Sequence, residues 1–390
     1  MLSIALFSEC YHPMRNGVVV SVSSFARQMA TLGHHVTIFT ARHPDQRGAE
    51  EGVYRFPSIT FPTRARYPVA IPLATGQARR VLAQTPFDIV HSNAPMTMGQ
   101  VALAYTRQRR LPLVFTYHTL IEEYTHYIPL PRPLVRGAAV GISRAYANAA
   151  HHVITPSAHV AVRLRDYGVH RPISVIPTGL DIDFIDSLPE TPLRARFDIP
   201  ADVPLLVYAG RLAREKNIPR ILQAFRLALA RRPDAHLLLI GGGPFDRGIL
   251  ALANALGITP RMRMTGFVDR ATVMQGLRAA DLFVFASLTE TQGLVIGEAM
   301  ACHTPVVAVA SPAAGEIIDS GQEGLLVEAT DVALAEGIIA LLADPTLRAA
   351  MAVHARRRAE SLSAALCTAR LLDIYHQAVA EYRPGLQARA

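Results

Sequence analysis

Residues 204–217 read PLLVYAGRLAREKN, an apolar run that ends in a glycine and continues into a charged loop. An uninterrupted apolar run of this length is typical of a strand buried on both faces, as in a parallel sheet. The residues that follow, 217–231, have the pattern of a helix. The stretch therefore predicts a strand, loop and helix, with the loop's charged side chains beyond the carboxyl end of the strand.

The same alternation extends along the chain in both directions. SIALFS at 3–8 and FDIVHS at 87–92 precede this stretch, and AHLLLIGG at 235–242 and ADLFVFAS at 280–287 follow it. Helix-like segments separate these runs. The pattern is that of repeated βαβ units, which predicts the α/β class with parallel sheets.

The length of the chain predicts two domains, because 390 residues exceed the roughly 150 of an average domain. Between residues 173 and 204 prolines and acidic residues interrupt the alternation, which indicates a boundary. Residues 364–381 are helix-like and follow the final strand signal. The predicted division is a first domain at 1–178, a linker at 179–203, a second domain at 204–363, and a C-terminal helix at 364–390 that returns to the first domain.

Composition limits the classes of protein that fit. A formal net charge of +8 favours an anionic partner, which leaves nucleic acid, a lipid surface and a phosphorylated ligand open. Three widely spaced cysteines do not form a disulfide framework. The sequence has no apolar run of the roughly 18 residues that a membrane span needs. We expect a cytoplasmic protein.

Glycines follow two of the predicted strands. Gly17 precedes a helix in SECYHPMRNGVVVS and would let the backbone approach a phosphate, although an ordinary turn also explains it. Gly241, Gly242 and Gly243 follow the strand at 235–240, but HLLLIGGGPFDRG matches neither GxGxxG nor GxxxxGK[ST]. A dinucleotide dehydrogenase and a P-loop kinase are therefore disfavoured.

Charged side chains follow two strands of the second domain. Arg211 and Lys216, the only lysine in the chain, could clamp a diphosphate. In SLTETQGLVIGEAMA, amides near Gly293 open a helix and could receive phosphate oxygens, while Glu298 could accept both hydroxyls of a ribose. Taken alone, these residues could also lie on a solvated surface.

GRLAREKN at 210–217, followed by ETQGLVIGE at 290–298, resembles the retaining glycosyltransferases of family four. The likeness extends to TYHT at 116–119 and PTGLD at 177–181, and it implies the GT-B fold, in which two Rossmann-like doubly wound domains enclose a cleft. It implies a nucleotide-sugar donor as substrate, no cofactor and no metal. The implied catalytic residues are His118, Glu290, Arg211 and Lys216, and the implied donor ligands are Gly17, Gln292, Gly293, Leu294 and Glu298.

The acceptor is to be sought in the first domain. TYHTLIEEYTHYIPLPR at 116–132 resembles the diacylglycerol glucosyltransferases of this family, although Ile121 replaces a tyrosine. The resemblance implies transfer of a hexose, glucose from a UDP-sugar, to a lipid such as diacylglycerol. The implied acceptor-binding residues are Glu122, Tyr124, His126 and Tyr127.

A helix at 132–147 supports the lipid interpretation independently. Its arginines, Arg132, Arg136 and Arg144, fall within about a third of the helical wheel. Apolar residues occupy the opposite side: Leu134, Val135, Ala138, Ile142 and Tyr146. Such a helix can lie on an anionic membrane surface, which would make the protein peripheral at the inner face of the membrane. A surface helix that buries its apolar side in the core is the alternative.

Three hypotheses follow: a lipid glycosyltransferase, a glycosyltransferase acting on a soluble sugar, polyol or phosphorylated polyol, and a basic protein that only binds nucleotide or nucleic acid. The third lacks RNA-binding signatures and leaves Glu290 and Glu298 unexplained. We therefore expect a nucleotide-sugar donor, a lipid or small-molecule acceptor, and no nucleic-acid partner.

Overall fold

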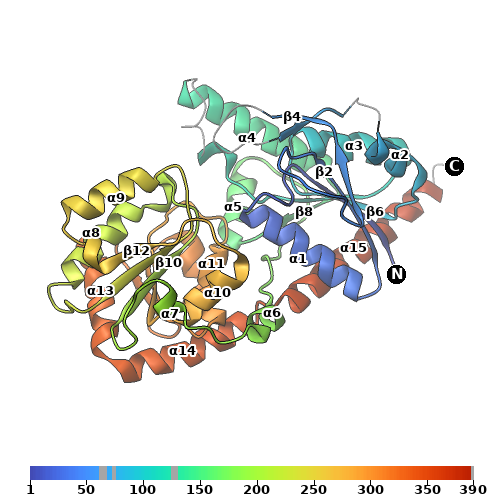
Figure 1. The fold of residues 1–390 in the computed structure, drawn as a ribbon. Helices are drawn as coiled ribbons and strands as arrows, with labels where there is room; N and C mark the ends of the chain where they lie inside the picture. The colour runs from blue at the N-terminus through green and yellow to red at the C-terminus, as the bar shows by residue number, and fades with distance from the viewer. Residues whose placement is uncertain (61–67, 73–75, 124–130, 388–390) are drawn as a thin grey trace. The chain divides into compact units, whose positions relative to one another are not determined.

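The computed structural model describes residues 1–60, 68–72, 76–123 and 131–387. The chain divides into two compact units. Unit 1 comprises Met1–Gly179 together with Ala364–Ala390, and unit 2 comprises Leu180–Ser363. Each has its own sheet with helices around it (Figure 1). The two units are described separately.

Unit 1 contains a parallel sheet of order β3-β2-β1-β6-β7-β8-β9. Its strands are β1 (Ser3–Ser8), β2 (His35–Ala41), β3 (Val53–Phe56), β6 (Ile89–Ser92), β7 (Leu113–Thr116), β8 (His152–Thr155) and β9 (Ile173–Val175). A separate antiparallel pair consists of β4 (Ser58–Thr60) and β5 (Pro68–Ala70). The strand order reverses between β1 and β6, and ligands of doubly wound sheets bind beyond the carboxyl ends of the strands at such a point.

Helices cover both faces of this sheet. Alternate strand residues point to opposite sides, so Leu6 packs with α1 (Gly17–Thr31), while Phe7 packs with helices of the other face. Those helices are α2 (Gln77–Gln84), α3 (Thr97–Arg109), α4 (Arg132–Ala149) and α5 (Ala158–Asp166). Burial on both faces explains why the strands read as continuous apolar runs.

The C-terminal helix α15 (Ala364–Gln387) belongs to unit 1. It lies along α1 (Figure 1). Cys367, Leu371 and Tyr375 are buried in the core on that side of the sheet. The hydroxyl of Tyr375 also hydrogen-bonds Nδ1 of the buried His91 on β6. The helix thus completes the core of a unit whose other elements lie at the opposite end of the sequence.

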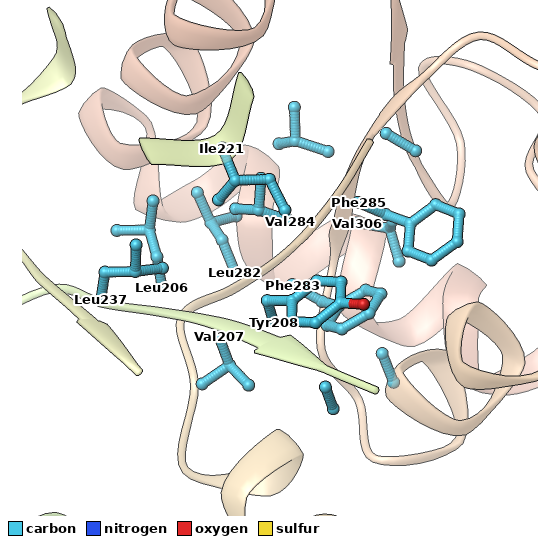
Figure 2. Close-up of a cluster of buried hydrophobic side chains, with 14 of the residues drawn as sticks. Leu206, Val207, Tyr208, Ile221, Leu237, Leu282, Phe283, Val284, Phe285 and Val306 are labelled. Atoms are coloured by element: carbon cyan, nitrogen blue, oxygen red, sulfur yellow. The ribbon is translucent and has the colours of Figure 1, made fainter. Parts of the chain in front are cut away.

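Unit 2 contains a parallel sheet of order β12-β11-β10-β13-β14-β15. Its strands are β10 (Leu205–Ala209), β11 (His236–Ile240), β12 (Met262–Met264), β13 (Leu282–Phe285), β14 (Val306–Val309) and β15 (Gly324–Val327). Figure 2 shows residues of β10, β11, β13 and β14 within one apolar cluster, and all the labelled side chains are buried. The order reverses between β10 and β13, which are adjacent in the sheet.

The helices of unit 2 precede, connect or follow these strands in the sequence. They are α6 (Ile182–Ser187), α7 (Leu193–Arg196), α8 (Ile218–Ala228), α9 (Asp246–Ala255), α10 (Arg270–Arg278), α11 (Leu294–Ala301), α12 (Pro312–Ile317), α13 (Asp331–Ala343) and α14 (Pro345–Glu360), with 3₁₀ turns η2 (Arg214–Lys216) and η3 (Thr259–Arg261). No single helix in the described part of the chain is long and apolar enough to cross a membrane. The pair α13 and α14 reaches that length and composition only together, bent by 102°.

The structure corrects the linker expected at 179–203. Most of that range belongs to unit 2, because Ile185, Leu193 and Ile199 are buried in its core. Arg278 on α10 also donates to the carbonyl of Leu188, with an N···O distance of 3.0 Å. Prolines and acidic residues interrupt the strand pattern here, but the apolar residues between them still bury. Residues 180–203 therefore belong to unit 2 through their buried residues, although many of their other side chains are exposed.

Candidate functional site

The loop that carries Arg211 is held by the glycine run of the neighbouring strand. The amide of Gly210 donates to the carbonyl of Ile240 at 2.9 Å, and that of Leu212 donates to Gly242 at 3.1 Å. A Cβ atom on Gly241 would lie 2.1 Å from the Gly210 oxygen. Glycine is required because the backbones of the two loops touch. The glycine run at 241–243, which matches neither the dinucleotide-binding nor the P-loop pattern, therefore positions the loop that carries Arg211.

Lys216 contacts Glu290 at the carboxyl end of the sheet. Nζ of Lys216 lies 2.5 Å from Oε1 of Glu290, and the two side chains are only 19% and 17% exposed. Arg211 forms an ion pair with Glu215 in the same loop. Tyr208, at the end of β10, is buried with its hydroxyl 3.3 Å from the Arg211 carbonyl, and burial raises its pKa, as do the charges of Glu290 and Glu215. The structure thus brings Lys216 and Glu290 together from positions 74 residues apart.

Helix α11 begins directly after the Glu290 loop. Gly293 precedes its first residue with a φ of +73°, a conformation that L side chains rarely adopt. The amides of the first helical turn, which include that of Leu294, lack partners within an α-helix, and the helix dipole favours negative charge there. Two cations after β10 and a helix N-terminus after the adjacent strand β13 can receive the oxygens of a phosphorylated group.

Glu298 lies inside α11 and is buried. Burial raises the pKa of its carboxyl group to about 6, while the charge of Arg270 opposes the rise. Nη2 of Arg270 is 3.7 Å from Oε1 of Glu298, and Nη1 is 3.5 Å from Oδ2 of Asp181. The guanidinium also stacks 5.0 Å from the ring centre of Phe184. Arg270 thus holds the Glu298 carboxylate beside a second buried acid.

Sequence reasoning missed Arg270. A local signal exists, because the Asp269 side chain accepts the Thr272 amide at 2.7 Å and caps α10 at the position before Arg270. Such a cap locates the helix start. It does not reveal the contact with Glu298, which lies 28 residues further along the chain.

The described residues contain no group of three or more histidine, cysteine, aspartate or glutamate side chains that could hold a metal ion. Asp181, the last residue of PTGLD at 177–181, pairs with Arg270.

In unit 1, His118 follows β7 and is partly buried. Its Nε2 atom lies 2.9 Å from Oδ1 of Asn93, which follows the adjacent strand β6. Burial lowers the pKa of His118 to about 4. Gly17 is the first residue of α1, behind the cap in which Asn16 accepts the Val19 amide at 3.0 Å. A Cβ atom on Gly17 would meet nothing within 4 Å, so local packing does not require glycine there.

The predicted acceptor residues are only partly covered by the structure. Tyr124, His126 and Tyr127 lie outside the described residues. The Glu122 carboxylate is buried, 3.3 Å from the Tyr117 hydroxyl and in hydrogen-bond contact with Tyr167. Nη1 of Arg163 on α5 is 3.5 Å from it. In the described structure Glu122 therefore ties its segment to α5, and direct contact with an acceptor stays a prediction.

Helix α4 presents its predicted arginines to solvent, since Arg132, Arg136 and Arg144 are all exposed. Leu134 is 71% exposed and Ile142 42% exposed. The apolar side is nevertheless divided. Tyr146 is buried and donates to the carbonyl of Gly99 at 2.8 Å, as the alternative of a helix that buries apolar residues in the core predicts for this residue. The buried side of α4 consists of Ala139, Ser143, Tyr146 and Ala147.

Two family models match the chain, one after the other. "Glycosyltransferase Family 4" matches residues 15–184, and "Glycosyl transferases group 1" matches residues 190–358. The alpha-monoglucosyldiacylglycerol synthase of Streptococcus pneumoniae is 30% identical over 337 residues, covering 83% of this chain and 75% of its own. A D-inositol 3-phosphate glycosyltransferase of Saccharomonospora viridis is 30% identical over 393 residues, covering 94% and 90%.

Solved structures share the fold. The crystal structure of Anabaena Alr3699/HepE in complex with UDP-glucose has a TM-score of 0.78 at 20% identity, covering 97% of this chain and 100% of that chain. The two parallel α/β units described above are those of a GT-B enzyme. As residues 210–217 and 290–298 predict, the chain belongs to glycosyltransferase family four and is a hexosyltransferase.

Proposed function

We propose that this enzyme transfers glucose from UDP-glucose to diacylglycerol with retention of the anomeric configuration. The observation that carries the proposal is the contact of Lys216 with Glu290, beside Arg211, at the carboxyl end of the unit 2 sheet. Two relatives named alpha-monoglucosyldiacylglycerol synthase, 30% and 28% identical to this chain, support the lipid acceptor. The UDP-glucose complex of a protein with the same fold supports the donor.

The reaction requires stabilisation of a leaving group. As the bond between the anomeric carbon and the diphosphate breaks, negative charge grows on the diphosphate and positive charge grows on the sugar. Arg211, Lys216 and the first amides of α11 stabilise the negative charge electrostatically. Glu290, which pairs with Lys216, faces the sugar in this proposal. The departing phosphate accepts the proton of the attacking hydroxyl, so the proposal assigns no side chain as general base.

The ribose of the donor contacts Glu298. A carboxylate can accept two hydroxyl hydrogens at once, and hydrogen bonds to a charged group contribute roughly 1.5–3 kcal/mol each. Arg270 lies 3.7 Å from this carboxylate and favours its ionised form against the effect of burial. Arg270 is therefore assigned to keep Glu298 ionised and oriented.

The lipid acceptor is reached through α4. The exposed side chains of Arg132, Arg136 and Arg144 can each contribute roughly 1 kcal/mol of attraction at an anionic surface. Leu134 and Ile142, exposed on the same helix, can enter the boundary between headgroups and acyl chains. The proposal is a peripheral enzyme that takes diacylglycerol from the membrane.

A phosphorylated polyol is the alternative acceptor. The D-inositol 3-phosphate glycosyltransferase of Saccharomonospora viridis aligns with 94% of the chain, more than the lipid synthase of Streptococcus pneumoniae. The deciding assay offers UDP-, GDP- and ADP-glucose with diacylglycerol in mixed micelles, and in parallel with inositol phosphates in solution. We expect transfer from UDP-glucose to the lipid, and transfer to the soluble acceptor alone would replace the lipid assignment.

Lys216→Ala and Arg211→Ala should each lower kcat on the order of 10²-fold, because each removes a charge that opposes the leaving diphosphate. Steady-state transfer rates of the purified variants measure the effect. Arg226→Ala is the matched control, because Arg226 is an exposed arginine on α8 of the same unit. If either variant turns over nearly as fast as the wild type, the replaced residue does not stabilise the leaving diphosphate.

Glu298→Gln should weaken nucleoside diphosphate binding by tenfold or more, because the amide keeps the shape but loses the charge. The pKa of Glu298 is about 6, so its carboxylate is ionised above that pH. The affinity ratio of wild type to variant should therefore be largest at pH 8 and should shrink as the pH falls through 6.

Calorimetric titration with UDP at several pH values provides these ratios, in which the titration of the nucleotide itself cancels. Glu336→Gln, at an exposed glutamate on α13, should behave as wild type. Equal affinities of wild type and Glu298→Gln at pH 8 would show that Glu298 does not bind the ribose.

Replacing Arg132, Arg136 and Arg144 with glutamate should abolish binding to anionic vesicles and leave UDP binding intact. Three reversals turn an attraction of roughly 1 kcal/mol per residue into repulsion. Raising the salt concentration should also weaken binding of the wild-type protein to anionic vesicles, because surface charges are screened over about 8 Å at physiological ionic strength. Sedimentation with vesicles of phosphatidylglycerol measures binding.

The control carries the same charge change on unit 2. Arg226, Arg231 and Arg357 are also exposed, and their replacement with glutamate should leave vesicle binding largely unchanged. If both triple variants lose binding equally, net charge alone governs attraction and α4 is not the docking surface.

A further inference from the structure

Tyr208 carries a hydroxyl group into the apolar core of unit 2. It lies on β10 and is fully buried. Its hydroxyl oxygen is the one polar atom among the labelled side chains of Figure 2. A buried hydroxyl group costs free energy unless it forms a hydrogen bond. Phenylalanine would fill the same space without this cost, so packing of the core alone does not explain the choice of tyrosine.

The partner of this hydroxyl group is the backbone of Arg211. The Tyr208 hydroxyl donates to the Arg211 carbonyl oxygen at 3.3 Å. The chain passes close over the ring, because a Cβ atom on Gly210 would lie 3.0 Å from the same hydroxyl oxygen. Gly210 also has a φ of +145°, a conformation that L side chains rarely adopt. The hydroxyl group therefore fixes the backbone at the residue whose side chain is a candidate ligand of the diphosphate.

The charged groups of the site lie near the same hydroxyl group. Burial raises the pKa of Tyr208 well above its usual range, and the charges of Glu290 and Glu215 raise it further. The group therefore stays protonated at every working pH and acts as a donor. The two carboxylates are the partners of Lys216 and Arg211, respectively. Tyr208 thus lies in the part of unit 2 where both candidate cations are held.

Lys216 is held by contacts that do not involve this tyrosine. Oγ of Ser287, which follows β13, donates to the Glu215 carbonyl at 3.2 Å. Nδ2 of Asn217 donates to the Ala286 carbonyl at 3.3 Å. These hydrogen bonds tie the second half of the loop to the end of β13. Loss of the tyrosine hydroxyl should therefore affect the first half of the loop and leave the second half in place.

We propose that Tyr208 is a positioning residue for Arg211, and that its hydroxyl group fixes the backbone from which the guanidinium reaches the leaving diphosphate. This inference rests on the proposed function, in which Arg211 opposes the negative charge that grows on the diphosphate. Such electrostatic stabilisation depends on groups that are fixed before the charge develops. A shifted backbone at Arg211 therefore lowers the rate of the chemical step more than it weakens donor binding.

Tyr208→Phe removes the hydroxyl group and keeps the ring. The Ala213 amide still donates to the Arg211 carbonyl at 3.0 Å, so this buried acceptor keeps a partner. We expect kcat for glucosyl transfer to fall about fivefold, the effect of one hydrogen bond, and KM for UDP-glucose to change less than about twofold. Tyr105→Phe is the matched control and should turn over like the wild type. Tyr105 is also buried, and its hydroxyl donates to the Thr85 carbonyl at 3.4 Å in unit 1.

A double-mutant cycle with Arg211→Ala tests whether the hydroxyl group acts through the guanidinium. Arg211→Ala keeps the backbone carbonyl that Tyr208 contacts but removes the side chain that this contact is proposed to orient. A general structural effect of Tyr208→Phe is therefore the same in both backgrounds, whereas an effect transmitted through the Arg211 side chain disappears in Arg211→Ala. In the Lys216→Ala background the fivefold loss should persist.

The outcomes separate the inference from the function on which it rests. Equal losses from Tyr208→Phe in the wild-type and Arg211→Ala backgrounds would overturn the inference. Wild-type kcat in Tyr208→Phe, beside a large loss in Arg211→Ala, would overturn it as well and leave the proposed function in place. Wild-type turnover in Arg211→Ala would instead contradict the proposed role of this arginine at the diphosphate. Thermal unfolding and UDP titration of each variant set the assay temperature, so that every rate is measured on folded protein.

Discussion

The organisation of unit 2 depends on the direct contact of two backbones at the ends of β10 and β11. Side chains larger than hydrogen cannot occupy Gly241 or Gly243, because carbonyl oxygens lie about 2 Å from where a Cβ atom would be. This contact fixes the loop that contains Arg211 and leads into η2. Because β13 is the other neighbour of β10, the loop after β13 ends beside it, and Lys216 reaches Glu290. The steric requirement for glycine at 241 and 243 thus helps to determine where Lys216 and Glu290 meet.

The candidate cations of unit 2 and the buried histidines of unit 1 differ in whether a carboxylate lies beside them. In unit 2 each of the two candidate cations has a carboxylate partner: Lys216 pairs with Glu290, and Arg211 with Glu215. Partly buried ions require such partners, because an unpaired charge in a poorly hydrated site is costly. In unit 1, His118 and His91 instead lose their charge, because burial is not offset by an acid.

The sequence predicted the parallel sheets and the strand-end positions of the candidate residues, because continuous apolar runs report burial on both faces. It did not predict partners that lie far along the chain. Arg270 and Glu298 are 28 residues apart, and Asn93 and His118 are 25 apart, and no local pattern encodes either contact. The burial of 180–203 was missed for a related reason: prolines end regular elements, but the apolar residues between them can still enter a core.

Helix α4 shows how one helix can serve both the core and the proposed membrane surface. Ala139, Ser143, Tyr146 and Ala147 bury against unit 1, so packing fixes the rotation of the helix. Its exposed side carries the three arginines, with Leu134 and Ile142 as the large apolar side chains. Burying one such side chain contributes roughly 1.5–3 kcal/mol, similar to the sum over three arginines at roughly 1 kcal/mol each. Neither contribution alone gives stable attachment, so under the proposed function the enzyme binds the membrane reversibly and in a salt-dependent way. That behaviour suits an enzyme that must combine a water-soluble donor with a lipid acceptor.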